Sequence, residues 1–327
     1  MTMILTCLTR NYVVQASDRR LSIVSKEKVQ AVTDDHNKAI IYGTYFVFAY
    51  TGTSKFGTDY TPDWAAQTLS KSKNLEEAVF RLKDQANEVM NYFYSGLGDN
   101  RASEKLIGFV GAGFLETVEN GKRLRKPIRI MVSNFIEENG RWVPRKKFAV
   151  EAEGLQVGKR HKLFVSGRPL SQGSRASLNL NIERCLRNKR AQGPDTIARF
   201  LARAILRAAE EDEAIGKNIM CTFVPRKFIN DNNMWIHLGG SLLENPVLSE
   251  EPQQLKPKLT HNLHERILIT PPFNRPQIVY IDKGTNPLTF HAPKYVRQGQ
   301  VVPEISMGNI SITIPPFIQA PNASIGQ

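Results

Sequence analysis

The first side chain that could do chemistry stands at the second position of the chain. Methionine aminopeptidases remove an initiator methionine when the next residue is small, and here Thr2 follows Met1. A threonine at a new N-terminus carries its own base, because an α-amino group has an ordinary pKa near 8 and can accept the hydroxyl proton. Thr2 is therefore a candidate nucleophile for an amide carbonyl. Threonine also follows methionine by chance in many proteins, so both interpretations stay open on this residue alone.

Three further residues could complete such a site, and each stands at the end of an expected strand. Asp18 ends the second strand of a hairpin that returns the chain toward Thr2, Lys38 begins the next hairpin, and Gly52 closes it. A nearby lysine lowers the pKa of an amine and keeps it neutral, and a carboxylate can orient that lysine. A glycine N–H can stabilise an oxyanion. Surface ion pairing is the alternative role for Asp18 and Lys38.

The elements that must position these residues follow from the hydrophobic pattern. The order of elements is two β-hairpins, two helices, four strands, two helices and a closing strand. The expected ranges are 3–9 with 12–17, 38–42 with 45–50, 62–70, 75–94, 105–111, 127–136, 147–153, 162–166, 174–188, 194–211 and 218–224. Blocks of strands separated by blocks of helices predict an α+β fold in which stacked sheets lie between helix layers.

Size and composition indicate a globular protein of one large domain or two. The chain has 327 residues, of which 41% are hydrophobic. It contains no apolar run of the roughly 20 residues that a membrane span needs and no pattern of a signal peptide. Its three cysteines are far apart and lack metal-ligand spacing, so we expect reduced thiols in a cytoplasmic protein, with no metal and no cofactor.

The positive charge is confined to one part of the chain. The net charge is +13, yet residues 229–327 contain seven basic and seven acidic residues, so residues 1–228 carry the whole excess. This excess favours a polyanionic partner such as nucleic acid, although no nucleic-acid-binding motif accompanies it. The basic clusters Lys122–Arg125 and Arg145–Lys147 are interpreted as solvated turns. A salt-dependent DNA or RNA binding assay would separate this hypothesis from an enzymatic one.

A change of composition near residue 228 predicts a domain boundary. Residues 229–327 hold 12 of the 18 prolines and show no helical period. Short β-like runs occur at 267–270, 278–281 and 310–314. We therefore expect a first domain over 1–228, followed over 229–327 by an extended arm or small β appendage. This arm would pack on the core or mediate assembly.

The spacing of these residues resembles the proteasome β-subunit family of N-terminal nucleophile (Ntn) hydrolases, over about residues 2–228. In that family a carboxylate follows the N-terminal threonine after sixteen residues, with an arginine two further on, as Thr2, Asp18 and Arg20 do here. The family's catalytic lysine precedes an oxyanion-hole glycine by fourteen residues, as Lys38 precedes Gly52. The interval between Asp18 and Lys38 is longer than in the family, which indicates a loop insertion.

The later part of the chain resembles the same family with two departures. The stretch 195–225 is similar to the family's last helix, D-x-x-S-G turn and closing strand, and Asp212 and Gly216 match that turn. Asp212 would help to fix the N-terminal amine. Ile215 stands where the family has serine, and Arg168 follows Gly167 where the family has a G-S-G turn. We consider Ser166 or Ser171 as substitutes.

The resemblance implies a four-layer αββα sandwich, assembly into a ring or another homo-oligomer, and a threonine-type peptidase that cleaves a peptide or small amide. Thr2 would attack the carbonyl, Lys38 and Asp18 would tune the amine, and Gly52 would stabilise the oxyanion. Tyr50 would line the substrate pocket, with core packing as its alternative role. A catalytically silent Ntn-fold scaffold or binding protein is the competing function, favoured by the altered serine turns.

Overall fold

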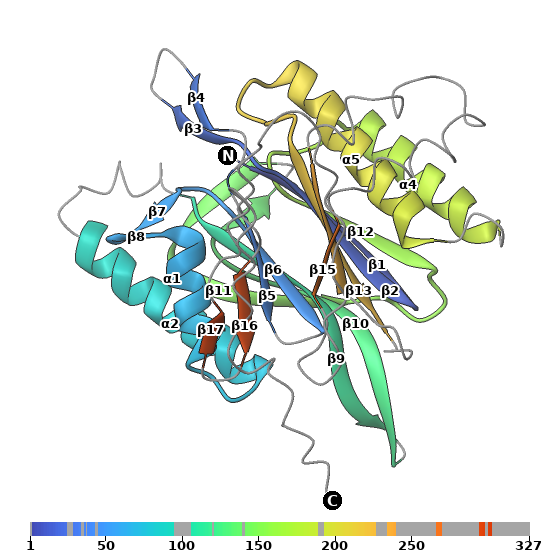
Figure 1. Ribbon diagram of the computed structural model, residues 1–327, viewed down its shortest axis with the longest axis horizontal. Helices are drawn as coiled ribbons and strands as arrows, with labels where there is room; N and C mark the ends of the chain where they lie inside the picture. Colours follow the sequence, from blue (N-terminus) through green and yellow to red (C-terminus); the bar gives the residue numbers. More distant parts are fainter. Residues whose placement is uncertain are drawn as a thin grey trace, which may run out of the picture.

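Two large β-sheets form the centre of the computed structural model (Figure 1). The structure describes residues 2–24, 29–33, 36, 38–42, 45–94, 106–119, 121–138, 141–188 and 193–226, together with four short strands in the C-terminal segment. Two further two-stranded sheets accompany the large ones. The described part of the chain is therefore a mixed α/β structure in which nearly all neighbouring strands run antiparallel.

The first large sheet contains both ends of the expected first domain. Its strands, in spatial order, are β12 (His161–Gly167), β1 (Met3–Thr9), β2 (Tyr12–Asp18), β13 (Ile219–Pro225), β14 (Met234–Gly239) and β15 (Arg266–Ile269). The predicted hairpin over 3–9 and 12–17 is present, with Ile4 opposite Ser17. The closing strand β13 pairs with β2 along its whole length, so that Ile219 lies opposite Asp18.

The second large sheet contains the hairpin that carries Lys38 and Gly52 at its ends. Its strands, in spatial order, are β11 (Arg141–Gly154), β10 (Lys122–Glu138), β9 (Gly108–Glu119), β6 (Phe46–Thr51), β5 (Ala39–Tyr42), β16 (Lys294–Arg297) and β17 (Gln300–Val302). Only the β16–β5 pair is parallel among the described strands. Strands β9, β10 and β11 are longer than the sequence pattern predicts.

The interpretation of the two basic clusters as turns was wrong. Lys122–Arg125 forms the start of β10, in register with Glu119–Glu116 of β9, and Arg145–Lys147 lies inside β11. The side chains of Lys122, Lys146 and Lys147 are exposed as expected. Charged residues persist in these strands because the backbone ladder stabilises a ribbon whose polar faces remain in water, and Arg125 also pairs with Glu116 at 2.7 Å.

Each large sheet is covered on one face by two helices. Helices α4 (Gln172–Arg187) and α5 (Pro194–Glu211) bury their apolar faces against the first sheet, in a cluster that includes Leu5, Ile182 and Leu201. Helices α1 (Thr61–Ser70) and α2 (Leu75–Tyr94) pack in the same way on the second sheet, around Leu82 and Phe109. Figure 1 shows the two helix pairs on opposite sides of the sheets.

The remaining faces of the two sheets meet each other. Ile4 of β1, Ala49 of β6 and Val110 of β9 form a small buried cluster between them. Gln15 of β2 donates a hydrogen bond of 3.2 Å across this interface to the carbonyl of Val110. The first and second hairpins, which carry the candidate site residues, are thereby held together by packing at the molecular centre.

Helix α2 begins with two hydrogen bonds between its first turn and the residues just before it. Asn74 accepts a hydrogen bond of 2.8 Å from the Glu77 N–H, and the Glu77 carboxylate accepts one of 2.9 Å from the Lys73 N–H. This reciprocal pair satisfies amides that the helix leaves open at its start. The buried positions Leu75, Val79 and Leu82 recur at helical spacing and lie on one face of α2.

Several short elements were not predicted. The interval between Asp18 and Lys38 contains the hairpin of β3 (Leu21–Val24) and β4 (Val29–Thr33), and β7 (Lys55–Phe56) pairs with β8 (Asp59–Tyr60). In the C-terminal segment, β15 overlaps the predicted run at 267–270, whereas β14, β16 and β17 are additional. The runs predicted at 278–281 and 310–314 lie outside the described residues. No helix in the described ranges combines the length and apolarity needed to cross a bilayer.

Candidate active site

The β1–β2 hairpin brings Thr2 next to Asp18. Because Ile4 pairs with Ser17, the residue that precedes β1 and the residue that ends β2 meet at one edge of the sheet. The N–H of Met3 donates a hydrogen bond of 2.8 Å to Oδ2 of Asp18. Asp18 is fully buried and Thr2 is 4% exposed. Thr2 and Asp18 are thus shielded from water on the described structure.

Lys38 joins these two residues from the second sheet. Its Nζ lies 2.7 Å from Oγ1 of Thr2 and 3.0 Å from Oδ1 of Asp18. It also donates a hydrogen bond of 2.6 Å to the Arg20 carbonyl. Lys38 is 2% exposed. An ammonium group this close to a hydroxyl stabilises the alkoxide that forms when the hydroxyl loses its proton, so the arrangement suits a nucleophilic threonine.

The Asp18 carboxylate is the centre of this cluster. Besides Lys38 and the Met3 N–H, Oδ1 accepts hydrogen bonds from the N–H of Arg20 at 3.0 Å and of Gly216 at 3.4 Å. A carboxylate that accepts several N–H bonds can remain ionised in a buried position. Gly216 therefore contributes through its backbone, at the turn that leads into β13.

The carbonyl of Thr2 has two donors that the sequence analysis missed. Oγ1 of Thr51 lies 3.2 Å from it, and the N–H of Arg168 lies 3.0 Å from it. Gly167 precedes Arg168 with a φ of +80°, and a Cβ at this position would stand 1.8 Å from the Thr2 oxygen. Only glycine permits this close approach. Thr51 stands directly before the predicted Gly52, which is the one sequence signal that could have identified it.

A small cavity lies beside the cluster. It has a volume of about 110 Å³, and its lining residues are Arg20, Leu21, Lys38, Tyr50, Gly52, Thr53, Ser54 and Ala214. Gly52 has a φ of +113°, and a Cβ there would meet the Leu106 carbonyl at 2.2 Å. Gly52 and Lys38 therefore border one cavity. An oxyanion donor and a lysine that act on one substrate must both lie beside the space that the substrate occupies, and these two residues meet that condition.

Tyr50 belongs both to the core and to the wall of the cavity. Its side chain is 2% exposed and packs in the core of the second sheet, yet it also lines the cavity. Burial raises the pKa of the Tyr50 phenol, and the negative charge of Asp18 raises it further. The phenol is thus neutral throughout the physiological range, and it can take part in hydrogen bonds without adding charge.

Asp212 forms an ion pair with Arg168. Its Oδ2 lies 2.9 Å from Nε of Arg168, and its Oδ1 accepts a hydrogen bond of 2.9 Å from the Ala214 N–H. Among the described residues, Asp212 forms no hydrogen bond with Thr2. Arg20 binds the same turn through a 2.8 Å hydrogen bond to the Glu213 carbonyl. The ion pair with Arg168 joins this turn to the loop that contacts the Thr2 carbonyl.

Ile215 stands where the resembled family has a serine; it is 1% exposed and packs in the core cluster of the first sheet. The two serines considered as substitutes form hydrogen bonds with other residues. Ser166 accepts a hydrogen bond of 3.2 Å from Arg129. Ser171 is the N-cap of α4 and accepts from the Ser174 N–H at 3.2 Å. Neither serine hydrogen-bonds to Thr2 within the part of the chain that the structure describes.

The described residues contain no group of three or more His, Cys, Asp or Glu side chains that could hold a metal ion. Cys7, Cys185 and Cys221 are all buried free thiols. Burial raises the pKa of the Cys221 thiol to about 12 and also raises the pKa of the Cys7 thiol. These thiols are therefore protonated, and they act as small apolar core groups.

Comparison with known proteins yields distant structural neighbours. Neither a protein-family model nor a curated protein matches the chain. A Gly-1 mutant of Anbu from Hyphomicrobium sp. strain MC1 is similar with 13% sequence identity over 69% of this chain and 82% of that chain, at a TM-score of 0.41. Anbu, an ancestral beta-subunit, from Yersinia bercovieri is similar with 12% identity over 69% and 81%, at a TM-score of 0.40. Similarity at this level carries nothing about activity, so the function is inferred from the residues of this chain.

Proposed function

We propose that the protein is a proteasome-like Ntn amidohydrolase, a threonine-type peptidase with a four-layer αββα sandwich, whose nucleophile is Thr2 after removal of Met1. The observation that carries this proposal is the buried contact of 2.7 Å between Lys38 Nζ and Thr2 Oγ1, with Asp18 at 3.0 Å from the same ammonium group. A buried lysine and carboxylate cost free energy to desolvate, and a threonine hydroxyl needs no such pair for structural reasons. Activation of the Thr2 hydroxyl explains why both charged side chains are buried at this position.

The proposed reaction begins with the free α-amino group of Thr2 as the base. The amine, directly or through a water, takes the hydroxyl proton, and Oγ1 forms a bond to the amide carbonyl carbon. The Gly52 N–H stabilises the negative oxygen of the tetrahedral intermediate. The carbon–nitrogen bond then breaks, the amine leaving group takes the proton, and an ester to Thr2 remains. Water hydrolyses this ester and restores the hydroxyl.

The cavity beside Lys38 is proposed to receive the substrate group next to the scissile bond. Its volume of about 110 Å³ is well below that of the pockets that enclose drug-sized ligands. Tyr50 closes one wall, and Arg20, Thr53 and Ser54 present polar groups. We therefore expect a preference for peptides or small amides with a small or polar side chain at this position.

The test compares the wild-type protein with Thr2→Ala after intact-mass analysis and N-terminal sequencing. Both variants are offered a panel of peptidyl fluorogenic amides and a β-lactone probe. We expect loss of Met1, a probe adduct on the peptide that begins with Thr2, and a fall in hydrolysis on the order of a thousandfold in Thr2→Ala. Thr58→Ala is the matched control, because Thr58 is exposed in the turn between β7 and β8.

Retention of Met1 in folded protein would refute the catalytic role, because Thr2 would then lack the amine that acts as base. Equal hydrolysis by the wild type and Thr2→Ala would refute it as well. In either case the alternative is a catalytically silent Ntn-fold scaffold. That alternative is favoured by the position of Asp212, which pairs with Arg168, and by the burial of Ile215 in the core, where the resembled family has a serine.

We further propose that residues 1–228 form the catalytic unit of a homo-oligomer and that residues 229–327 form an arm that packs on this unit or its neighbour. Strands β14 and β16 of the arm pair with β13 and β5 of the unit, which supports packing on the core. Light scattering of the full chain and of a truncation after residue 228 tests the assembly role. An unchanged oligomer mass after truncation would refute it.

A further inference from the structure

A second groove lies between the two helices that cover the first sheet. Its volume is about 90 Å³, and its lining residues are Ser174, Ser177, Leu178, Asn181, Phe200, Arg203, Ala204 and Arg207. Helix α4 supplies the first four and helix α5 the rest. The groove shares no residue with the cavity beside Lys38, so a ligand here would be distinct from a substrate of the proposed peptidase.

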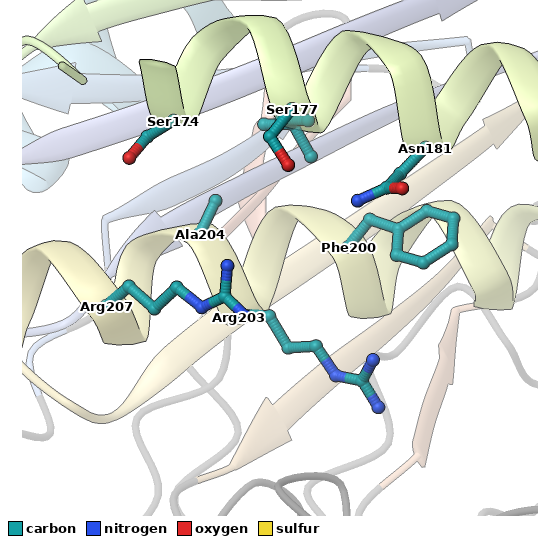
Figure 2. Close-up of a pocket in the computed structure, with 8 residues that line it drawn as sticks. Ser174, Ser177, Asn181, Phe200, Arg203, Ala204 and Arg207 are labelled. Atoms are coloured by element: carbon teal, nitrogen blue, oxygen red, sulfur yellow. The ribbon is translucent and has the colours of Figure 1, made fainter. Parts of the chain in front are cut away.

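The α4 side of the groove presents three polar side chains, and two of them lack hydrogen-bond partners among the described residues. Figure 2 shows the polar ends of Ser174, Ser177 and Asn181 directed from α4 toward α5. Ser174 accepts a hydrogen bond of 2.9 Å from the Ser171 hydroxyl. The side chains of Ser177 and Asn181 form no hydrogen bond within the described residues. Their hydroxyl and amide groups can therefore donate to a ligand without the loss of an internal contact.

The α5 side carries two arginines that repel each other. Arg203 and Arg207 are four residues apart on one helix, where like charges are unfavourable. Burial lowers the pKa of Arg203, and the positive charge of Arg207 lowers it further. Nε of Arg203 is buried and has no hydrogen-bond partner in the described structure. Neither arginine forms an ion pair there, so a negative charge between them would relieve an existing repulsion.

Acidic side chains of the same two helices do not supply this charge. No acidic residue lines the groove. Glu183 of α4 pairs with Arg187 at 3.1 Å and with His161 at 3.3 Å. Glu210 and Glu211 lie at the C-terminal end of α5 and are exposed. Among the acidic side chains that the structure describes on these helices, none neutralises the arginine pair.

We propose that the groove between α4 and α5 binds a phosphate group. Two guanidinium groups, two hydroxyls and one amide can each donate to phosphate oxygens, and arginine matches the geometry of such oxygens well. The space admits one phosphate-sized group and excludes a whole nucleotide. Phe200 and Leu178 form an apolar wall that reduces competition from water. A carboxylate is the competing ligand, but its two oxygens would leave more of these donors unused.

The test is calorimetric titration of the full-length protein with inorganic phosphate at constant ionic strength and pH 7.5, with sodium acetate titrated in parallel. We expect phosphate to bind with a dissociation constant on the order of millimolar and acetate to bind more weakly. The substitutions Arg203→Gln and Arg207→Gln should each weaken phosphate binding on the order of tenfold or more, because each removes a charged hydrogen-bond donor.

Arg184→Gln is the matched control, because it removes one positive charge from an exposed position of α4 outside the groove. Its phosphate binding should equal that of the wild type. The proposal fails if the wild type shows no phosphate binding, if acetate binds as tightly, or if Arg184→Gln weakens binding as much as Arg207→Gln. Arg207 is exposed, so Arg207→Gln remains a valid test if Arg203→Gln does not fold.

Discussion

Removal of the Asp18 charge is the sharpest test of the buried cluster, since it does not depend on whether the site is catalytic. In Asp18→Asn, the ammonium of Lys38 stays 98% buried but loses its ion-pair partner at 3.0 Å. The new amide NH₂ also replaces one of the two acceptor oxygens, so it faces a donor in either orientation: the Met3 N–H at the Oδ2 position or the Arg20 N–H at the Oδ1 position. Both changes leave donors without acceptors in a site where the side chains of Asp18 and Lys38 are buried.

Loss of one partner from a buried ion pair costs about 3–5 kcal/mol of unfolding free energy. We expect Asp18→Asn to lie in that range. Lys38→Met should cost less, about 1–3 kcal/mol, because the Asp18 carboxylate would keep the N–H groups of Met3, Arg20 and Gly216 as donors. The double variant should cost less than the sum of the two single variants, because the residues share one interaction.

Urea unfolding followed by circular dichroism measures all three variants, and Lys73→Met on the loop before α2 is a control for the removal of a lysine charge at an exposed position. The order of the two single variants is decisive. A Lys38→Met variant as costly as Asp18→Asn would contradict the account of Asp18 as a carboxylate held by backbone amides. A cost below about 1 kcal/mol for both would show that the cluster is solvated.

Two further predictions concern backbone geometry and pH. Gly167→Ala should destabilise the protein by roughly 2–4 kcal/mol in thermal unfolding, because its Cβ would collide with the Thr2 carbonyl. Gly158 is the control: it has a similar φ of +84° but open space around it, so Gly158→Ala should cost about 1 kcal/mol. Equal costs for the two variants would contradict the close approach at Gly167. The unfolding free energy should fall as pH rises from about 9 toward 12, because the unfolded Cys221 thiol ionises near its ordinary pKa while the folded thiol does not until about 12. Chemical unfolding at pH 8 and 10 measures the fall, which should shrink by about 1 kcal/mol in Cys221→Ala.

The order and type of the main elements could be predicted because their signals are local. The helices over 61–70, 75–94, 172–187 and 194–211 follow the apolar period, with the cap at Asn74 and a proline in the first turn at Pro194. The ends of β9, β10 and β11 could not be predicted. Their outer parts form a polar ribbon, and its stability comes from pairing with a neighbouring strand rather than from a buried face. The same reason explains why the basic clusters were mistaken for turns.

The candidate site could be predicted in its residue types but not in all of its contacts. The alternation of the first hairpin places Thr2 and Asp18 at one sheet edge, and this follows from the sequence. Lys38 comes from the other sheet, so its distance of 2.7 Å from Thr2 depends on how the two sheets pack. Thr51 and the Arg168 N–H were missed because both donate to a backbone carbonyl, and a backbone carbonyl has no sequence signature; only the position of Thr51 next to Gly52 pointed to it.

By itself the sequence determined the elements and the hairpin that carries Thr2 and Asp18. These depend on neighbours within a few residues, through strand alternation and helical period. The close approaches at Gly52 and Gly167 come from Leu106 and Thr2, which are distant in the chain. Only the tertiary structure decided that Asp212 pairs with Arg168, that Ile215 lies in the core, and that Arg203 and Arg207 of α5 line one groove with Ser174, Ser177 and Asn181 of α4. Such partners are distant in the chain, and which of several residues of suitable chemistry come within 3 Å is set by the packing of sheets and helices.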